Sequence, residues 1–456
     1  MSNIAVLDIG KTNAKVLLID GSTGVELAVE RSPNRVIDAP PYPHHDVEGL
    51  FTFILGALKA IAARHRIDAI SITAHGGSAV LVAEDGSLAL PMLDYEFSGI
   101  DETRAAYDKL RPPFEETGSP PLPGGLNVGA QLFWQQTKFP NDFARAKWIV
   151  TYPQYWSMRL TGQASAEPTS LGCHTDVWNP WAGDFSSLVD RMGWRAKFPP
   201  VRPAGEVLGP VLPEIAAAAG LIEGTPVTSG IHDSNASLLP YLQGTKQPFS
   251  VASTGTWIIA FAVGGALKPL DAARDTLANV NALGQPTPTA RFMGGRSMEL
   301  LCEGQPAAWQ ADDLDAVLRT PIMARPSIVP GCGPYPAAAF GWLGADQPSP
   351  GARTVAASFY CALMTAASLD LLGAQGPIHV DGPFAQNSLF LQMLAVATNR
   401  FVVAQSGAVS GPAAGAALLV EQPAQRASSG TVTTPSSVPA AFSAYAEAWR
   451  AMVQAM

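Results

Sequence analysis

Two short turns rich in glycine and threonine stand far apart in this chain, at 8–13 and at 253–256. Each follows a short apolar strand and precedes another. Backbone N–H groups and small hydroxyls in such turns are compact donors, so two turns facing each other could hold a polyphosphate. The residues expected to contact phosphate are Gly10, Lys11, Thr12 and Asn13 in the first turn, and Thr254, Gly255 and Thr256 in the second.

The first turn is not a P-loop. That pattern places a glycine five residues before the Gly-Lys-Thr triplet and a helix after it. This chain has Ala5 at the glycine position, and the residues after Thr12 form an apolar strand pattern. A strand–turn–strand hairpin remains, in which Asp8 at the strand end could hold Mg²⁺.

A second carboxylate, Asp233, lies where a predicted strand passes into a predicted helix, just after Gly230. It could take the proton of a substrate hydroxyl and share the metal with Asp8, or it could simply be the N-cap of the helix. Its neighbours His232 and Ser234 complete the composition of a catalytic triad. We expect adjacent residues not to point at one another in relay, so a serine hydrolase is not favoured.

Further candidates lie in loops. The turn with Gly382, Pro383 and Asn387 could let the flat base of a nucleotide approach the backbone closely, although a simple tight turn is the alternative. Gly411, close to Gly407, could help to close the nucleotide pocket. Donor and acceptor side chains beside an aromatic wall suit a small polyhydroxylated substrate, although each could instead be a solvated loop residue. The predicted substrate residues are His75, Asp94, Glu96, His232 and Arg296.

Composition narrows the possible classes. A chain of 456 residues with 47% apolar and 15% charged residues should form two folded domains. The net charge of −9 makes nucleic acid an unexpected partner. Four cysteines without a C-x-x-C pair indicate free thiols. No leader-like start and no uninterrupted apolar run of ~18 residues are present, so we expect a cytoplasmic protein without membrane contact.

The order of predicted elements repeats weakly. A hairpin followed by alternating strands and helices occurs once from residue 4 and again from residue 249. This predicts two α/β lobes, 1–243 and 244–456, with a cleft between them. The segment 422–439, rich in proline, serine and threonine, is expected to be a loop.

Several motifs together resemble the FGGY family of carbohydrate kinases over essentially the whole chain. They are the segments 8–13, 155–162, 224–227, 230–236 and 253–256. The resemblance implies two actin-like (ribonuclease H-like) lobes that bind ATP, Mg²⁺ and a sugar, with Asp233 as general base. The chain departs from the family pattern at Trp257, at Asp381-Gly382-Pro383 and at 131–140, where the family's lysine is missing.

These observations predict ATP-dependent phosphorylation of a small neutral sugar, most simply a ketose such as a pentulose, a tetrulose or a 6-deoxyhexulose. Asp94, Glu96 and Asp233 would repel an anionic substrate unless Arg296 dominated. The alternative is an actin- or Hsp70-like ATPase acting on a protein partner, although a base beside an acceptor is unneeded there. A homodimer is compatible with the sequence.

Overall fold

The computed structural model describes residues 2–266, 268–345, 347–404, 411–421 and 430–456. The chain forms two compact units. Unit 1 contains residues 1–244 and 278–286 and the described part of 408–426, and unit 2 contains the remaining segments from 245 onward. The sequence assigned every residue after 243 to the second lobe, whereas packing places 278–286 and the helix that begins at Gly411 in unit 1.

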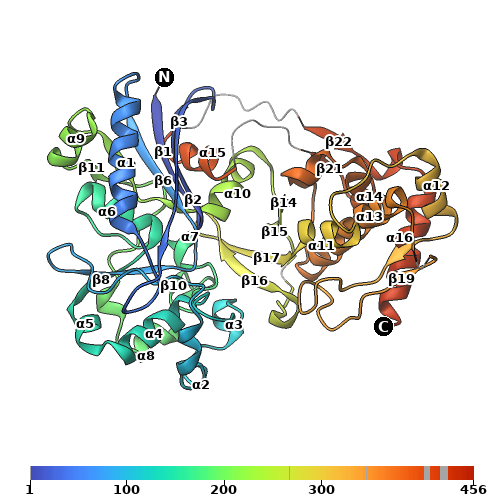
Figure 1. The fold of residues 1–456 in the computed structure, drawn as a ribbon, viewed down its shortest axis with the longest axis horizontal. Helices are drawn as coiled ribbons and strands as arrows, with labels where there is room; N and C mark the ends of the chain where they lie inside the picture. The colour runs from blue at the N-terminus through green and yellow to red at the C-terminus, as the bar shows by residue number, and fades with distance from the viewer. Residues whose placement is uncertain (1, 267, 346, 405–410, 422–429) are drawn as a thin grey trace. The chain divides into compact units, whose positions relative to one another are not determined.

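A mixed sheet forms the centre of unit 1, with strand order β11-β12-β6-β1-β2-β3 and with β13 beside β6 (Figure 1). Strand β1 pairs antiparallel with β2 and parallel with β6, and β6 runs parallel to β12 and β13. The strands are β1 (Asn3–Ile9), β2 (Asn13–Asp20), β3 (Glu26–Pro33), β6 (Ala69–Ala74), β11 (Val207–Pro210), β12 (Pro226–Thr228) and β13 (Ile231–His232).

Both faces of this sheet are buried, which explains why β1 is apolar at almost every position. Ala5, Leu7 and Ile9 lie in one core with helices α1 (Val47–Ala62) and α6 (Tyr152–Thr161). Ile4 and Val6 lie in another core with α10 (Asp233–Gly244) and α15 (Gly411–Leu418). The α10 and α15 backbones approach so closely that a side chain on Gly415 would collide with the carbonyl of Ala236.

A third core lies under the long irregular segment of unit 1. Strands β7 (Ala79–Ala83) and β8 (Ala146–Thr151) pair antiparallel there. Unit 1 also contains shorter elements. They are β4 (Val36–Ile37), β5 (His44–His45), α2 (Arg104–Tyr107), α3 (Phe114–Thr117), α4 (Val128–Lys138), α5 (Pro140–Arg145), α7 (Pro168–Leu171), β9 (Trp178–Asn179), β10 (Asp184–Phe185), α8 (Ser187–Arg191) and α9 (Pro213–Ala219), of which α9 packs on α1.

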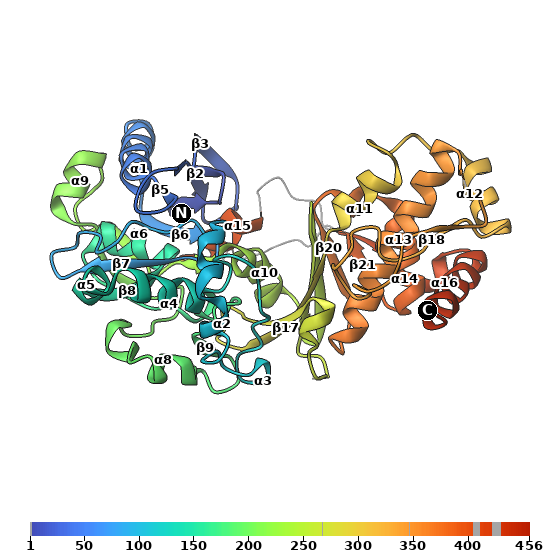
Figure 2. The same ribbon diagram turned by 60° about the horizontal axis from the view of Figure 1, so that its bottom comes forward.

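Unit 2 is built on a sheet of order β16-β17-β15-β14-β20-β21-β22. Helices α13 and α14 pack together beside this sheet, and α16 packs on α14 (Figure 2). The strands are β14 (Phe249–Thr254), β15 (Ile258–Val263), β16 (Thr276–Val280), β17 (Pro286–Phe292), β20 (Ile378–Asp381), β21 (Val402–Ala404) and β22 (Thr431–Thr433), with β18 (Met323–Ala324) and β19 (Trp342–Leu343) as a separate pair. The helices are α11 (Gly294–Leu301), α12 (Ala311–Arg319), α13 (Pro350–Leu371), α14 (Ser388–Thr398) and α16 (Ala440–Gln454).

One expectation needs correction. The segment 422–439 is not only loop, because β22 adds an edge strand antiparallel to β21; residues 422–429 lie outside the described residues. Helix α13 has the length and apolar composition of a membrane-spanning helix, although the sequence contains no long uninterrupted apolar run. Since 83% of its apolar window is buried in the protein, its composition is explained by its place in the core of unit 2.

Candidate functional site

Three strands of unit 1 end together and bring polar residues to one edge of the sheet. Asp8 of β1 and Ile231 of β13 both pair with Thr73 of β6. His75 and Asp233 are the residues that follow β6 and β13, so they lie at the same edge as Asp8. Carboxyl ends of parallel strands are where open α/β sheets usually carry their sites. The sequence predicted these three residues separately, and the sheet register brings them together.

Asp233 is held through one carboxylate oxygen. Its Oδ1 accepts hydrogen bonds from the backbone N–H of Ser234 at 2.6 Å and from the Ser234 hydroxyl at 3.2 Å, and it lies 3.2 Å from Nε2 of His232. Its Oδ2 has no partner among the residues that the structure describes. The side chain is 29% exposed, yet the carboxyl lies deep among protein atoms, and this burial raises the pKa of Asp233 while nearby His75 opposes the rise.

The neighbouring residues His232 and Ser234 both contact Asp233. Both contacts are with the carboxylate, so the relay order of a serine hydrolase is not formed. Nδ1 of His232 accepts from the Asn235 amide at 3.0 Å, which leaves the proton on Nε2, facing Asp233. Burial lowers the pKa of His232 to about 4, so the ring is neutral at pH 7.

A buried glutamate, Glu167, holds the backbone at His232 in place through Thr169. The backbone N–H of His232 donates to the Thr169 hydroxyl at 3.1 Å, and that hydroxyl donates to Glu167 at 2.6 Å. Burial raises the pKa of Glu167 to about 7, against the hydrogen bonds it accepts from Thr169 and Ser170. Sequence reasoning missed Glu167; the available signal was Pro168, because proline is favoured at the first position of a helix, which places Glu167 at the N-cap.

His75 lies in an aromatic cage. Its ring centroid is 4.9 Å from that of Tyr152 and 5.5 Å from those of Tyr95 and His45. Nδ1 contacts the carbonyl of Gly76 at 3.0 Å, and buried Nε2 has no hydrogen-bond partner in the described parts of the chain. Burial lowers the pKa of His75, so Nε2 is available as an acceptor for a hydroxyl.

Lys11 and Asp94 form an ion pair, which joins a predicted phosphate residue to a predicted substrate residue. The Lys11 ammonium also lies 4.9 Å from the centre of the Tyr95 ring and 3.7 Å from the carboxylate of Glu96. Asp94 is buried, whereas the Glu96 side chain is 68% exposed. The other two donors of this turn, Thr12 and Asn13, are exposed and hydrogen-bonded to each other at 3.0 Å.

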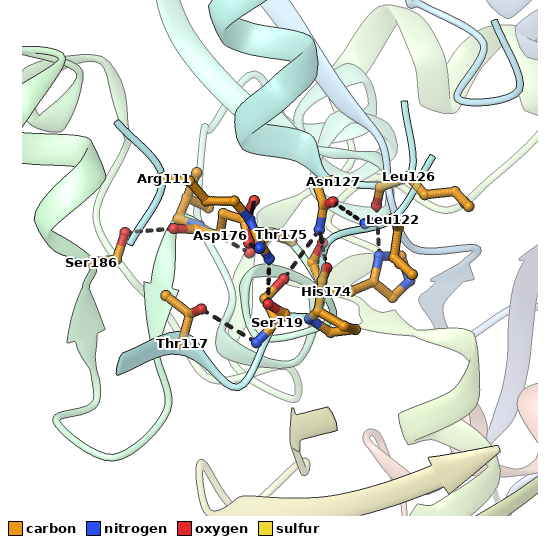
Figure 3. Close-up of polar contacts among 12 residues, drawn as sticks. Arg111, Thr117, Ser119, Leu122, Leu126, Asn127, His174, Thr175, Asp176 and Ser186 are labelled. Atoms are coloured by element: carbon orange, nitrogen blue, oxygen red, sulfur yellow. Dashed lines mark hydrogen bonds and ion pairs between the residues drawn. The ribbon is translucent and has the colours of Figure 1, made fainter. Parts of the chain in front are cut away.

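A hydrogen-bonded network joins segments of unit 1 that are distant in the sequence (Figure 3). Arg111 donates twice to the buried carboxylate of Asp176, at 2.9 Å each, and Asn127 donates to the carbonyl of His174 at 2.9 Å. His174 is a non-glycine residue with φ of 43°. The Cε1 atom of its ring would lie 3.2 Å from a Cβ on Gly77, next to His75. Sequence reasoning missed His174, because the network joins residues distant in the chain.

In unit 2, the polar groups of the second turn, at 253–256, form hydrogen bonds with neighbouring parts of the same unit. The Thr254 hydroxyl donates to the carbonyl of Asp381 and accepts from the N–H of Phe384 at 3.1 Å. Gly382 has φ of 76°, and a side chain there would collide with the Thr254 carbonyl. The N–H of Gly255 donates to the Trp257 carbonyl at 2.9 Å. The Thr254 hydroxyl and the Gly255 N–H, both predicted phosphate donors, thus hold the turn itself, and Thr256 is exposed.

Four other predicted residues have structural roles. The Asn387 side chain accepts from the N–H of Phe390 at 3.1 Å and caps α14, while Pro383 begins a short 3-10 helix. Gly411 starts α15 and packs against Ser237 in unit 1, not among the nucleotide-lobe residues, and Gly407 lies outside the described residues. Arg296 belongs to unit 2, is 45% exposed and pairs with Glu299 at 2.7 Å, so unit 1 does not contain it with the other substrate candidates.

Asp8 is the best candidate for a cation ligand among the predicted residues. Its carboxylate lies 3.7 Å from the Lys15 ammonium. Burial raises the pKa of Asp8, Lys15 opposes the rise, and the negative charge of Asp233 adds to it. Two carboxylates that repel each other suit a shared divalent cation. No group of three or more histidine, cysteine, aspartate or glutamate side chains within the described residues could hold a metal.

The fold and the residues at the sheet edge define a two-unit α/β protein with a hairpin-first sheet in each unit. Family models match nearly the whole chain, as "FGGY family of carbohydrate kinases, N-terminal domain" over residues 3–240 and "Carbohydrate kinase FGGY, C-terminal domain" over 246–428. The chain therefore belongs to the FGGY family of carbohydrate kinases, with the mixed α/β, actin-like fold predicted from its sequence.

Individual relatives agree with this assignment. A carbohydrate kinase from Novosphingobium aromaticivorans is 36% identical, with a TM-score of 0.90 over 98% of this chain and 100% of that one. The xylulose kinase of Lactobacillus acidophilus, at 17% identity and a TM-score of 0.77 over 100% of this chain and 98% of its own, shares the fold. The L-fuculokinase of Escherichia coli is 25% identical over 56% of this chain and 55% of its own length. The chain thus spans about half the length of the curated relatives it matches.

Proposed function

We propose that this protein transfers the γ-phosphoryl group of ATP to a hydroxyl of a small neutral ketose, with Asp233 as the general base. The observation that carries the proposal is the state of the Asp233 carboxylate. Oδ1 is fixed by Ser234 and His232, while Oδ2 has no partner among the described residues. A carboxylate oriented through one oxygen can use the other to take the proton of a substrate hydroxyl.

The chemistry makes modest demands on this base. Phosphoryl transfer has a loose transition state, so positioning and charge neutralisation matter more than base strength. Burial raises the pKa of Asp233, which makes the carboxylate a better proton acceptor than an exposed aspartate. The His232 Nε2–H can stabilise the ionised form before the hydroxyl arrives.

The substrate side of the site supports a neutral polyhydroxylated compound. Buried Nε2 of His75 has no hydrogen-bond partner among the described residues and could accept from a hydroxyl. Asp94 is balanced by Lys11, while Asp233 remains a negative charge next to which an anionic substrate would be unfavourable. The names of two relatives, L-fuculokinase and probable L-xylulose kinase, support a ketose over a polyol.

ATP and Mg²⁺ complete the proposal. Asp8, with Asp233 close by, would hold the cation, and the electrostatic coupling between the two carboxylates supports this. In unit 1, the exposed side chains of Thr12 and Asn13 would donate to phosphate. In unit 2, the turn at 254–256 would offer further phosphate donors, and the turn at Gly382 and Pro383 would lie near the adenine ring of ATP. Mg²⁺ neutralises charge on the β- and γ-phosphates when it is bound.

The test is a coupled assay of ADP release with a panel of neutral ketoses, aldoses, polyols and sugar acids, with and without Mg²⁺. We expect Mg²⁺-dependent ADP release with at least one neutral ketose and with no sugar acid. Activity confined to a sugar acid or a sugar phosphate would contradict the substrate class. ATP turnover indifferent to every sugar but stimulated by a protein fraction would favour the actin- or Hsp70-like alternative.

A further inference from the structure

Lys11 does not lie where its position in the phosphate turn suggests. Its ammonium contacts Asp94, a residue 83 positions away in the loop that carries Tyr95 and Glu96. The turn itself is held elsewhere, because the Gly10 carbonyl accepts from the Asn34 side chain at 2.8 Å and the Gly10 N–H donates to the Asn13 carbonyl. The Lys11 side chain is therefore directed away from the hairpin and toward the substrate candidates.

The ion pair is largely removed from water. The Lys11 side chain is 16% exposed and that of Asp94 is 10% exposed. Taking two charges out of water costs free energy that their attraction only partly offsets, so such a pair is weak evidence for a role in stability. Its position beside Tyr95, whose ring also contacts the His75 ring, points to a role in binding.

The pair offers complementary hydrogen-bonding groups. The ammonium has three N–H donors, and the contact with Asp94 requires only one of them. Oδ1 of Asp94 accepts from Lys11 and from the N–H of Glu96 at 3.2 Å, while Oδ2 accepts from none of the described residues. One donor and one acceptor side by side match two adjacent hydroxyl groups, of which one accepts and the other donates.

We infer that Lys11 and Asp94 together bind a vicinal diol of the sugar, and that Lys11 is a substrate-specificity residue and not a phosphate ligand. The inference rests on the proposed sugar kinase function and deepens it, because it requires two adjacent free hydroxyls on the substrate. A phosphate at Lys11 would approach the carboxylates of Asp94 and Glu96, which repel it.

The hairpin offers a matched control. Lys15 lies four residues after Lys11 and its ammonium is 3.7 Å from the Asp8 carboxylate, on the side where the metal and phosphates are proposed to bind. Lys11→Gln and Lys15→Gln remove the same charge from the same hairpin. The two variants therefore separate a sugar contact from a phosphate contact at equal net charge.

The experiment measures KM for the best ketose and for ATP with wild type, Lys11→Gln, Asp94→Asn and Lys15→Gln. A hydrogen bond to a charged group is worth about 10- to 100-fold in affinity, so we expect Lys11→Gln and Asp94→Asn to raise KM for the sugar by about that factor. KM for ATP should stay within about twofold. A substrate analogue lacking one hydroxyl of the diol should lose affinity with wild type and lose little further with Lys11→Gln.

Each outcome has a defined meaning. No sugar-dependent ADP release by wild type would overturn the proposed function itself. An active wild type whose Lys11→Gln variant raises KM for ATP, as Lys15→Gln is expected to, and leaves KM for the sugar unchanged would overturn this inference alone. Should Lys11→Gln unfold because Asp94 is left unpaired, the double variant Lys11→Gln/Asp94→Asn removes both charges. Calorimetry of sugar binding without nucleotide then gives the answer, since unchanged affinity rejects the diol contact.

Discussion

The hairpin of unit 1 and the hairpin of unit 2 have the same connections but different surroundings. In unit 1, β1 lies between antiparallel β2 and parallel β6, and in unit 2, β14 lies between antiparallel β15 and parallel β20. A further antiparallel strand, β3 or β17, pairs with the second strand of each hairpin. The two hairpins thus share their strand pairing, but the polar groups at their turns have different partners.

The difference lies in what the polar groups contact. In unit 1, buried acidic and imidazole groups gather at the strand ends, while the turn residues Thr12 and Asn13 remain exposed. In unit 2, the Thr254 hydroxyl is used to hold the loop at Gly382, and Trp257 lies under the guanidinium of Arg291 at 5.2 Å. Under the proposed function, the first hairpin would carry side chains for chemistry and the second would provide a backbone platform.

The largest effect that tests this division is expected at Asp233. Asp233→Asn keeps the shape and the contacts with Ser234 but removes the proposed proton acceptor, so turnover should fall by ~10²–10⁴. The measurement is sugar-dependent ADP release, with circular dichroism to check folding. A folded variant with near-normal turnover would mean that the charge cluster of unit 1 is not the catalytic region.

Acid should destabilise unit 1 through His232. Its pKa is about 4 in the folded protein against 6.5 when unfolded, because burial disfavours the imidazolium. The unfolded chain therefore binds more protons between pH 6.5 and 4, so this group reduces the unfolding free energy by up to about 3 kcal/mol as pH falls through that range. Glu167, with its pKa raised to about 7, acts in the opposite direction between pH 7 and about 4.5.

The pH test is therefore a difference between variants. The unfolding free energy from urea titrations at pH 7, 5.5 and 4.5 should fall more steeply for wild type than for His232→Gln. His65→Gln, at a partly exposed site beyond helix α1, serves as the control and should keep the wild-type slope. Equal slopes in all three proteins would show that burial of His232 does not govern its protonation.

Sequence reasoning succeeded where the signal is local and failed where partners meet across the fold. The apolar strands expected around the turn at 8–13 correspond to β1 and β2, because two buried faces require such apolar runs. Asp8, His75 and Asp233 could be selected individually as polar residues at or just after the ends of strands. The Lys11–Asp94 pair joins residues 83 apart, and the Thr254–Asp381 bond joins residues 127 apart, so no spacing rule predicts either.

The platform role of the second hairpin predicts a stability effect. Thr254→Val removes the hydroxyl that bonds to the Asp381 carbonyl and to the Phe384 N–H, and it leaves both groups without that partner. The unfolding free energy should fall by about 1–3 kcal/mol. Thr12→Val in the first hairpin should change it by less than about 0.5 kcal/mol, as is usual for exposed residues. Equal losses, measured by urea unfolding, would contradict the division between the two hairpins.

The smallest effect concerns binding at the exposed turn of the first hairpin. The Thr12 hydroxyl contacts only the Asn13 side chain among the described residues, so it can turn toward a phosphate at little cost. Thr12→Val removes one such hydrogen bond, typically worth about 0.5–1.5 kcal/mol, and should raise KM for ATP by about 2- to 10-fold. KM for the sugar should not change, because the sugar contacts are assigned to Lys11 and Asp94 and not to Thr12. A shift in KM for the sugar with none for ATP would place both Thr12 and Lys11 in the sugar site and leave the phosphates to the backbone of the second turn.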